Sequence, residues 1–133
     1  MFKNISHIGI AVRDIRTSTE LFRKLFGKDP DRTEELPAHG VKTAFFDLGS
    51  SSVELTETTD PHSSMKRFVD NRGEGMHHIS FLVEDIRREL VRLKANGFEI
   101  IDEEPRLGAD GYLVAFLHPR STNGVLVELC QKT

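Results

Sequence analysis

The 133-residue sequence lacks several features that define specialised protein classes. It has one cysteine, Cys130, so no disulfide can form within the chain, and a reducing cytosolic location is expected. It has no tryptophan, and its apolar runs end after four or five residues. A membrane-spanning helix needs about 20. It has no basic tract and a net charge of −3, which argues against nucleic acid as the main partner.

The overall composition is typical of a globular protein. Hydrophobic residues make up 38% of the chain and charged residues 29%. The length predicts a single domain, 1–133, that is large enough to bury a core without help from disulfides. Six histidines and 21 acidic residues are the groups whose placement could carry chemistry.

The most informative feature is an internal repeat. Residues 7–15 recur 71 positions later as residues 78–86, with His, Ile, Val, Asp and Ile in matching places. Residues 53–55, Val-Glu-Leu, recur 74 positions later as residues 127–129. Because both matches keep their order and the two offsets differ by only three, the chain is expected to contain two copies of one supersecondary unit.

Each copy has the pattern of a βαβββ module, so we expect an α+β fold. An apolar β-rich run ends just before an aspartate in N-cap position, Asp14 or Asp85, and a helical pattern follows. Three extended segments come after each helix, with Gly and Pro between them. The expected strands are residues 4–12, 31–36, 41–48 and 52–57 in the first module, and 76–83, 99–102, 112–117 and 125–129 in the second. The modules cover about 1–60 and 74–133, and a linker helix lies within about 61–73.

The repeat selects four candidate metal ligands. Each copy has a histidine on its first strand and a glutamate on its last, which gives the set His7, Glu54, His78 and Glu128. Since alternate side chains share a face in a strand, each histidine shares its face with small neighbours, including Gly9 and Ser80, and the opposite face should pack on the helices. Two imidazoles and two carboxylates suit a divalent ion such as Co²⁺, Zn²⁺, Ni²⁺ or Mn²⁺.

Taken singly, none of these residues identifies a metal site. A lone histidine in a strand is more often a hydrogen-bonded structural residue, and a lone glutamate is more often exposed. It is their repetition at matching positions that favours a metal. His77 should face the other side of its strand. Cys130 follows Glu128 by two residues and is interpreted as a small buried thiol. The remaining histidines lie in turn-like contexts: His39, His62 and His118.

With these features, the chain resembles the vicinal oxygen chelate superfamily, and within it the methylmalonyl-CoA epimerases. The resemblance covers essentially the whole chain, and its most specific part is the C-terminal stretch 115–129. The other matching stretches are residues 7–12, 73–79 and 104–109. The resemblance implies tandem βαβββ modules forming a curved eight-stranded mixed sheet around one divalent metal ion.

The resemblance also implies a reaction, the interconversion of (2R)- and (2S)-methylmalonyl-CoA. A proton must leave the carbon between a thioester and a carboxylate, and another must arrive on the opposite face. The metal would stabilise the charge of the enolate. The expected partner is therefore an acyl-CoA thioester, and family members are often homodimers. Arg106 and Arg120 lie near loop ends and are candidates for contacts with CoA phosphates, although solvated surface arginines are an equal alternative.

Two positions depart from the pattern of some family members. Some members have a glutamate base on the strand after the Gly-Val turn, where this chain has Thr43, and some have glutamine at the metal position of Glu54. Threonine is a poor base. The hypothesis is therefore that Glu54 and Glu128 are the two proton-transfer groups as well as metal ligands.

The ligand set leaves two alternatives open. The same four residues fit a glyoxalase I-type lactoylglutathione lyase, whose chemistry also passes through an enolate. A non-catalytic binding protein of the resistance type has the same fold, but it needs no paired bases. The C-terminal half favours the epimerase.

Overall fold

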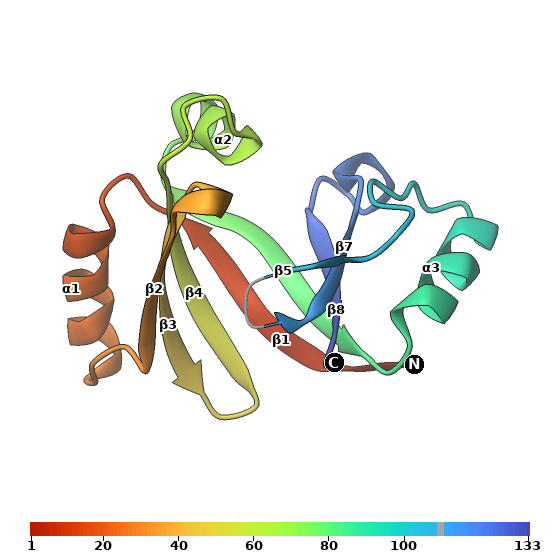
Figure 1. Cartoon of the computed structure of the whole chain (residues 1–133), viewed down its shortest axis with the longest axis horizontal. Coiled ribbons are helices and arrows are strands. Elements are labelled where there is room, and N and C mark those ends of the chain that lie inside the picture. Colours follow the sequence, from red (N-terminus) through yellow and green to blue (C-terminus); the bar gives the residue numbers. More distant parts are fainter. Residues whose placement is uncertain (109–110) are drawn as a thin grey trace. The chain divides into compact units, whose positions relative to one another are not determined.

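The computed structural model describes residues 1–108 and 111–133 (Figure 1). Ala109, the last residue of one family-like stretch, lies outside them. In chain order, the named strands and α-helices of these residues are β1 (Phe2–Ala11), α1 (Ile15–Phe26), β2 (Arg32–Leu36), β3 (Val41–Leu48), β4 (Ser51–Thr58), α2 (Ser64–Arg72), β5 (Gly75–Val83), α3 (Ile86–Ala95), β6 (Arg106–Leu107), β7 (Leu113–Leu117) and β8 (Val127–Gln131). This is two βαβββ modules joined by a helix, so the predicted α+β fold is confirmed.

The strands form one mixed eight-stranded sheet, as expected. The hydrogen-bonding order is β2-β3-β4-β1-β5-β8-β7-β6. The pair β5–β8 is parallel, whereas β2–β3, β3–β4, β6–β7 and β7–β8 are antiparallel. The chain divides into two compact units, one made of Ile8–His77 and the other of Met1–His7 with His78–Thr133. Within the described residues, no helix has both the length and the apolar character needed to cross a membrane.

In the unit Ile8–His77, α1 begins after the aspartate that the sequence predicts as its N-cap. The Asp14 carboxylate accepts a hydrogen bond from the Arg16 backbone N–H, and Gly27 ends the helix with a φ of 70°. The helix packs through Phe22 and Phe26 on one face of the strands. The buried core of this unit is Val12, Ala44, Phe46 and Leu55.

In the other unit, α3 repeats this arrangement. The Asp85 carboxylate accepts from the Arg88 N–H, and the Ile86 N–H donates to the Gln131 side chain at 2.7 Å. The same helix-start contact exists in the first unit, where Ile15 N–H donates to Glu57 at 2.8 Å. The core under α3 is Val83, Ile86, Leu90, Leu93, Ala115, Leu117 and Leu129.

One predicted strand was wrong. The sequence places a strand at residues 99–102, but Ile100 makes only an isolated bridge with Leu117, and β6 lies at Arg106–Leu107. The Ile101 N–H still donates to the Phe116 carbonyl at 2.9 Å. At the next position the Asp102 carboxylate, not a backbone carbonyl, accepts the Phe116 N–H at 2.8 Å, which ends the pairing. The other strands differ from the prediction by one or two residues at their ends.

The predicted linker helix is α2. The Ser63 hydroxyl accepts from the Lys66 N–H, and Gly73 follows the helix with a φ of 81°. On α2, Phe68 makes an edge-to-face contact with the His77 ring, with 5.0 Å between ring centroids. His77 is thus packed against a helix.

Candidate metal centre

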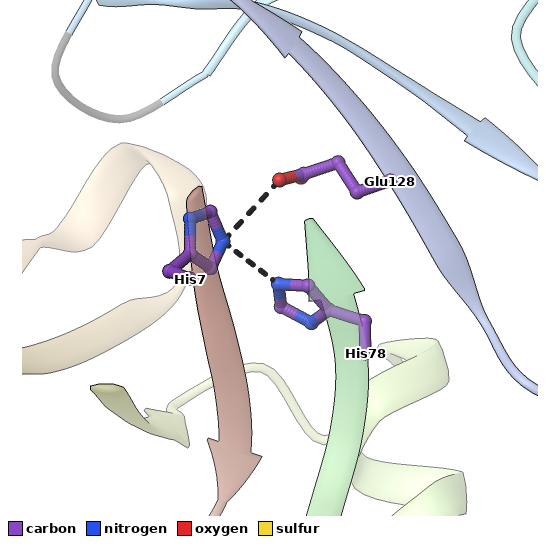
Figure 2. A group of neighbouring side chains, drawn as sticks. All are labelled: His7, His78 and Glu128. Carbon is purple, nitrogen blue, oxygen red and sulfur yellow. Dashed lines mark hydrogen bonds and ion pairs between the residues drawn. The ribbon is translucent and has the colours of Figure 1, made fainter. Parts of the chain in front are cut away.

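Three of the four predicted ligands converge in the unit made of Met1–His7 and His78–Thr133. His7 on β1, His78 on β5 and Glu128 on β8 each offer one ligand atom, and these atoms lie within 4.8 Å of one another. Figure 2 shows the two rings and the carboxylate pointing toward a common point. His78 and Glu128 follow His7 by 71 and 121 positions in the sequence, and the fold brings all three together.

The distances suit a shared divalent ion. The two Nε2 atoms of His7 and His78 are 3.1 Å apart, and His7 Nε2 lies 3.3 Å from Glu128 Oε1. For metal–ligand bonds of about 2.1 Å, two ligand atoms lie roughly 3.0 Å apart at a right angle and about 3.4 Å apart at a tetrahedral angle. The observed separations fall in this range.

Strand register explains why Glu128 lies on the histidine face of the sheet. Glu128 pairs with Ser80 in β5 and with Phe116 in β7. Paired residues point to the same side of a sheet, and Ser80 is two residues after His78, so the four side chains share one face. The opposite face, with Phe81, Val83 and Leu129, packs under α3. The predicted division into a helix-packed face and a ligand face is confirmed here.

Burial and charge also fit a cation. The side chains of Glu128 and His7 are only 9% and 15% exposed. Burial raises the pKa of the Glu128 carboxyl, but the nearby His7 and His78 imidazoles, together with the Ser80 hydroxyl, lower it by more, so its pKa lies below the ordinary value. Among the described residues, Glu128 Oε1 makes no hydrogen bond of regular geometry, although His7 Nε2 lies 3.3 Å away. A buried carboxylate oxygen of this kind calls for a cation, and the donor set fits a divalent metal.

Neighbouring groups support the histidines. Ser6 Oγ lies 3.4 Å from His7 Nδ1, and the Phe116 ring contacts the His78 ring edge-to-face at 5.7 Å. The Arg106 guanidinium lies 5.9 Å from the centre of the same Phe116 ring. Sequence reasoning missed Phe116. The signal was present, because the dipeptide Ala44-Phe45 recurs as Ala115-Phe116 at the repeat offset.

Glu54, the fourth predicted ligand, lies in the other unit and is outside the group of three. It is half-buried on β4, where it pairs with Phe45 of β3. Glu128 pairs with Phe116 in the same way. The Arg32 guanidinium lies over the Phe45 ring at 3.8 Å, much as Arg106 lies near Phe116. The phenylalanine paired with each glutamate, and the arginine near its ring, therefore repeat along with the sequence.

Comparison with known proteins identifies the family. Residues 6–116 match the model of the Glyoxalase/Bleomycin resistance protein/Dioxygenase superfamily. The chain belongs to this superfamily. The predicted resemblance is confirmed, since this is the family that includes the vicinal oxygen chelate fold.

Members of the superfamily with high similarity include named epimerases. Methylmalonyl-CoA epimerase, mitochondrial, of Dictyostelium discoideum is 38% identical over 129 residues, covering 96% of this chain and 78% of that protein. The uncharacterized protein YqjC of Bacillus subtilis is 39% identical over 127 residues, covering 96% and 91%. A solved methylmalonyl-CoA epimerase in complex with methylmalonyl-CoA and NH4+ superimposes with a TM-score of 0.93 at 32% identity, covering 100% and 96%.

The two arginines predicted to bind substrate, Arg106 and Arg120, differ in how closely a carboxylate holds each guanidinium. Arg106 is largely exposed on β6, with its Nε 3.8 Å from Asp102. The Arg120 guanidinium is held by the Glu99 carboxylate, and this contact keeps the pKa of Glu99 below its usual value. Arg106 is therefore the more available of the two for an anionic ligand.

The other candidates of the sequence analysis are accounted for locally. His118 Nδ1 accepts the Arg120 N–H and caps a short 3-10 helix, Pro119–Ser121. His39 ends the 3-10 helix Pro37–His39, and His62 lies in the turn before α2. Cys130 is buried opposite Val114, a position that agrees with a packed thiol.

Proposed function

We propose that this protein is a methylmalonyl-CoA epimerase that interconverts the (2R) and (2S) epimers. The convergence of His7, His78 and Glu128 is the observation that carries the proposal. The names of its relatives support an epimerase that acts on an acyl-CoA thioester. Relatives of this name with mitochondrial location exist, and a cytosolic location of this chain is proposed only from its single free cysteine. A homodimeric state is likewise a proposal.

The reaction sets three physical demands. The carbon between the thioester and the carboxylate must lose its proton, which makes an enolate with negative charge on oxygen. A proton must then arrive from the opposite face, so two acid–base groups are required. The enolate charge must be stabilised away from bulk water.

The residues proposed to hold a divalent ion are His7, His78 and Glu128, with Glu54 as the fourth ligand. Co²⁺, Zn²⁺, Ni²⁺ and Mn²⁺ all suit these donors. A bound ion of this kind would supply the positive charge that lowers the energy of the enolate.

Glu128 is proposed as one of the two proton-transfer groups. Its lowered pKa keeps the carboxylate ionised at neutral pH, so it can accept a proton. Glu54 is proposed as the second group because it repeats Glu128 in sequence and in its cross-strand phenylalanine. Thr43, the position of a glutamate base in some relatives, is buried on β3 between Glu34 and Thr56. Its hydroxyl is too weak a base to abstract a carbon-bound proton at neutral pH.

Arg106 and Arg120 are proposed to contact anionic groups of the CoA moiety. Arg106 has the stronger support, because its exposed guanidinium lies near the Phe116 ring that also contacts His78. Arg120 would first have to release Glu99.

The proposal is tested by proton NMR in D₂O. The metal-loaded protein is incubated with methylmalonyl-CoA and, separately, with the glutathione hemithioacetal of methylglyoxal. We expect exchange of the α-proton and epimerisation of methylmalonyl-CoA only. Product from the hemithioacetal would instead assign lactoylglutathione lyase activity, and exchange with neither substrate would favour a binding protein.

A further inference from the structure

Ser80 is a buried polar residue that the proposed reaction has not used. Its side chain is fully buried on β5. Among the described residues its Oγ makes no hydrogen bond of regular geometry, although the hydroxyl lies close enough to the Glu128 carboxylate to lower the pKa of that group. Buried hydroxyl groups are nearly always hydrogen-bonded, so an orphaned one requires an explanation. Among the described side chains, the other buried atom without a hydrogen bond of regular geometry is Glu128 Oε1, which lies 3.3 Å from His7 Nε2.

The two orphaned groups belong to neighbouring residues. Ser80 pairs directly with Glu128 in the parallel β5–β8 ladder. Paired residues in neighbouring strands are about 5 Å apart and point to the same side. Ser80 also follows His78 by two residues, so the hydroxyl lies on the ligand face, beside the carboxylate and away from the core under α3.

We infer that Ser80 is a positioning residue, whose hydroxyl donates a hydrogen bond to the Glu128 carboxylate when that carboxylate binds a metal ion. This inference rests on the proposed metal site. A serine hydroxyl can rotate its proton toward an acceptor with no backbone movement. A carboxylate has two oxygens, so one can bind the ion while the other accepts from Ser80. The hydrogen bond would hold the carboxylate in its ligating orientation.

The internal repeat separates this role from a general need of the fold. The residue that corresponds to Ser80 in the first copy is Gly9, which has no side chain. The βαβββ framework therefore forms without a hydroxyl at this position. The serine is present only in the copy whose strand pairs with Glu128.

The expected effect is on metal affinity. Groups that hydrogen-bond to metal ligands orient them, and their removal typically weakens metal binding by about 10- to 100-fold. A serine that served only packing would change the unfolding temperature and leave metal affinity unchanged. The two roles are thus distinguished by measuring both quantities on the same variants.

The test has two measurements. The full chain is titrated with Co²⁺ against a competing chelator, and binding is monitored by the Co²⁺ absorption spectrum. The unfolding temperature of the metal-free protein is measured separately. We expect Ser80→Ala to raise the Co²⁺ dissociation constant about 10-fold or more, with an unchanged unfolding temperature. Ser80→Thr, which keeps a hydroxyl, should recover most of the affinity. Cys130→Ala is the control, because it changes a buried side chain nearby and should leave Co²⁺ affinity unchanged.

Each outcome decides a separate question. Co²⁺ binding by Ser80→Ala as tight as that of the unmodified protein would overturn the role of Ser80 and leave the proposed metal site standing. Absence of Co²⁺ binding by the unmodified protein would overturn the site and the inference together. If Ser80→Ala does not fold, Ser80→Gly tests the same loss, since glycine stands at the corresponding position of the first copy and carries no group that could bind Co²⁺.

Discussion

The two copies of the repeat share a framework and differ on the face that carries chemistry. Both have an aspartate N-cap, Asp14 or Asp85, and in both the first helical N–H donates to a side chain of the last strand. Glu54 and Glu128 each pair with a phenylalanine that has an arginine near its ring. The two copies are therefore most alike in the residues that cap the helices and pair the strands.

The differences concern the surroundings of the two glutamates. Glu128 is buried beside Ser80, whereas Glu54 is half-buried and the first copy has glycine at the corresponding position. A duplicated fold can thus keep its caps and core while its two carboxylates acquire different surroundings. The proposed epimerisation needs two proton-transfer groups, and the following changes test whether the two glutamates fill these roles differently.

The largest effect is expected from Glu128→Gln. The amide cannot accept the α-proton and is a weaker metal ligand, so turnover should fall by at least about 10³-fold. Steady-state kinetics and metal content of the purified variant measure both losses. A variant within tenfold of normal turnover would contradict the assignment of Glu128.

Glu54→Gln should have a smaller and different effect. We expect metal to be retained and turnover to fall by about 10²-fold. Because the base on the other face would remain, solvent deuterium should still enter from one epimer, which NMR in D₂O detects. Near-normal turnover would remove Glu54 from the mechanism.

Arg106→Ala should raise KM for the acyl-CoA several-fold, with kcat within about twofold, because a contact to a distant anionic group contributes similarly to ground and transition states. Arg120→Ala is the matched comparison and should change KM less, since Glu99 already binds that guanidinium. A larger KM effect for Arg120 would reverse the ranking of the two arginines.

The smallest effect concerns a buried acid in only one copy. Glu89 on α3 is bound by Arg92, which together with other contacts lowers its pKa, whereas the corresponding residue of α1 is Ser18. A lowered pKa in the folded state stabilises the protein above the unfolded pKa of about 4.3, and this stabilisation is lost as pH falls through the folded pKa.

Glu89→Gln should therefore lower stability at pH 7 by up to about 1 kcal/mol. The difference from the unmodified protein should shrink below pH 4. Urea unfolding at several pH values measures it, and a difference that persists unchanged in acid would contradict the ionic explanation.

Much of the fold could be predicted because its signals are local. The aspartates Asp14 and Asp85, predicted as N-caps, stand directly before the first residues of α1 and α3. The strand placed at residues 99–102 failed because a side chain, Asp102, replaces the backbone acceptor, and no composition signal reports that. The two-residue strand β6 is too short for a periodic pattern to indicate.

The residues of the site that could be predicted are those that the internal repeat duplicates. Repetition identified His7, His78 and Glu128, which the structure brings together, and Glu54, which stays a proposal. Phe116 was missed although the repeated Ala-Phe dipeptide marks it, whereas Ser80 was missed because its importance depends on which strand pairs with β8 and in which register. Register between strands that are about 50 residues apart is set by tertiary packing, and a single sequence does not show it.

The most direct test of the central claim is the rate of α-proton exchange of methylmalonyl-CoA in D₂O, measured on one protein sample before chelation, after chelation and after Co²⁺ is restored. We expect exchange that is lost with the metal and returns with it, and no return in Glu128→Gln. Exchange that continues at full rate in the chelated protein would contradict it.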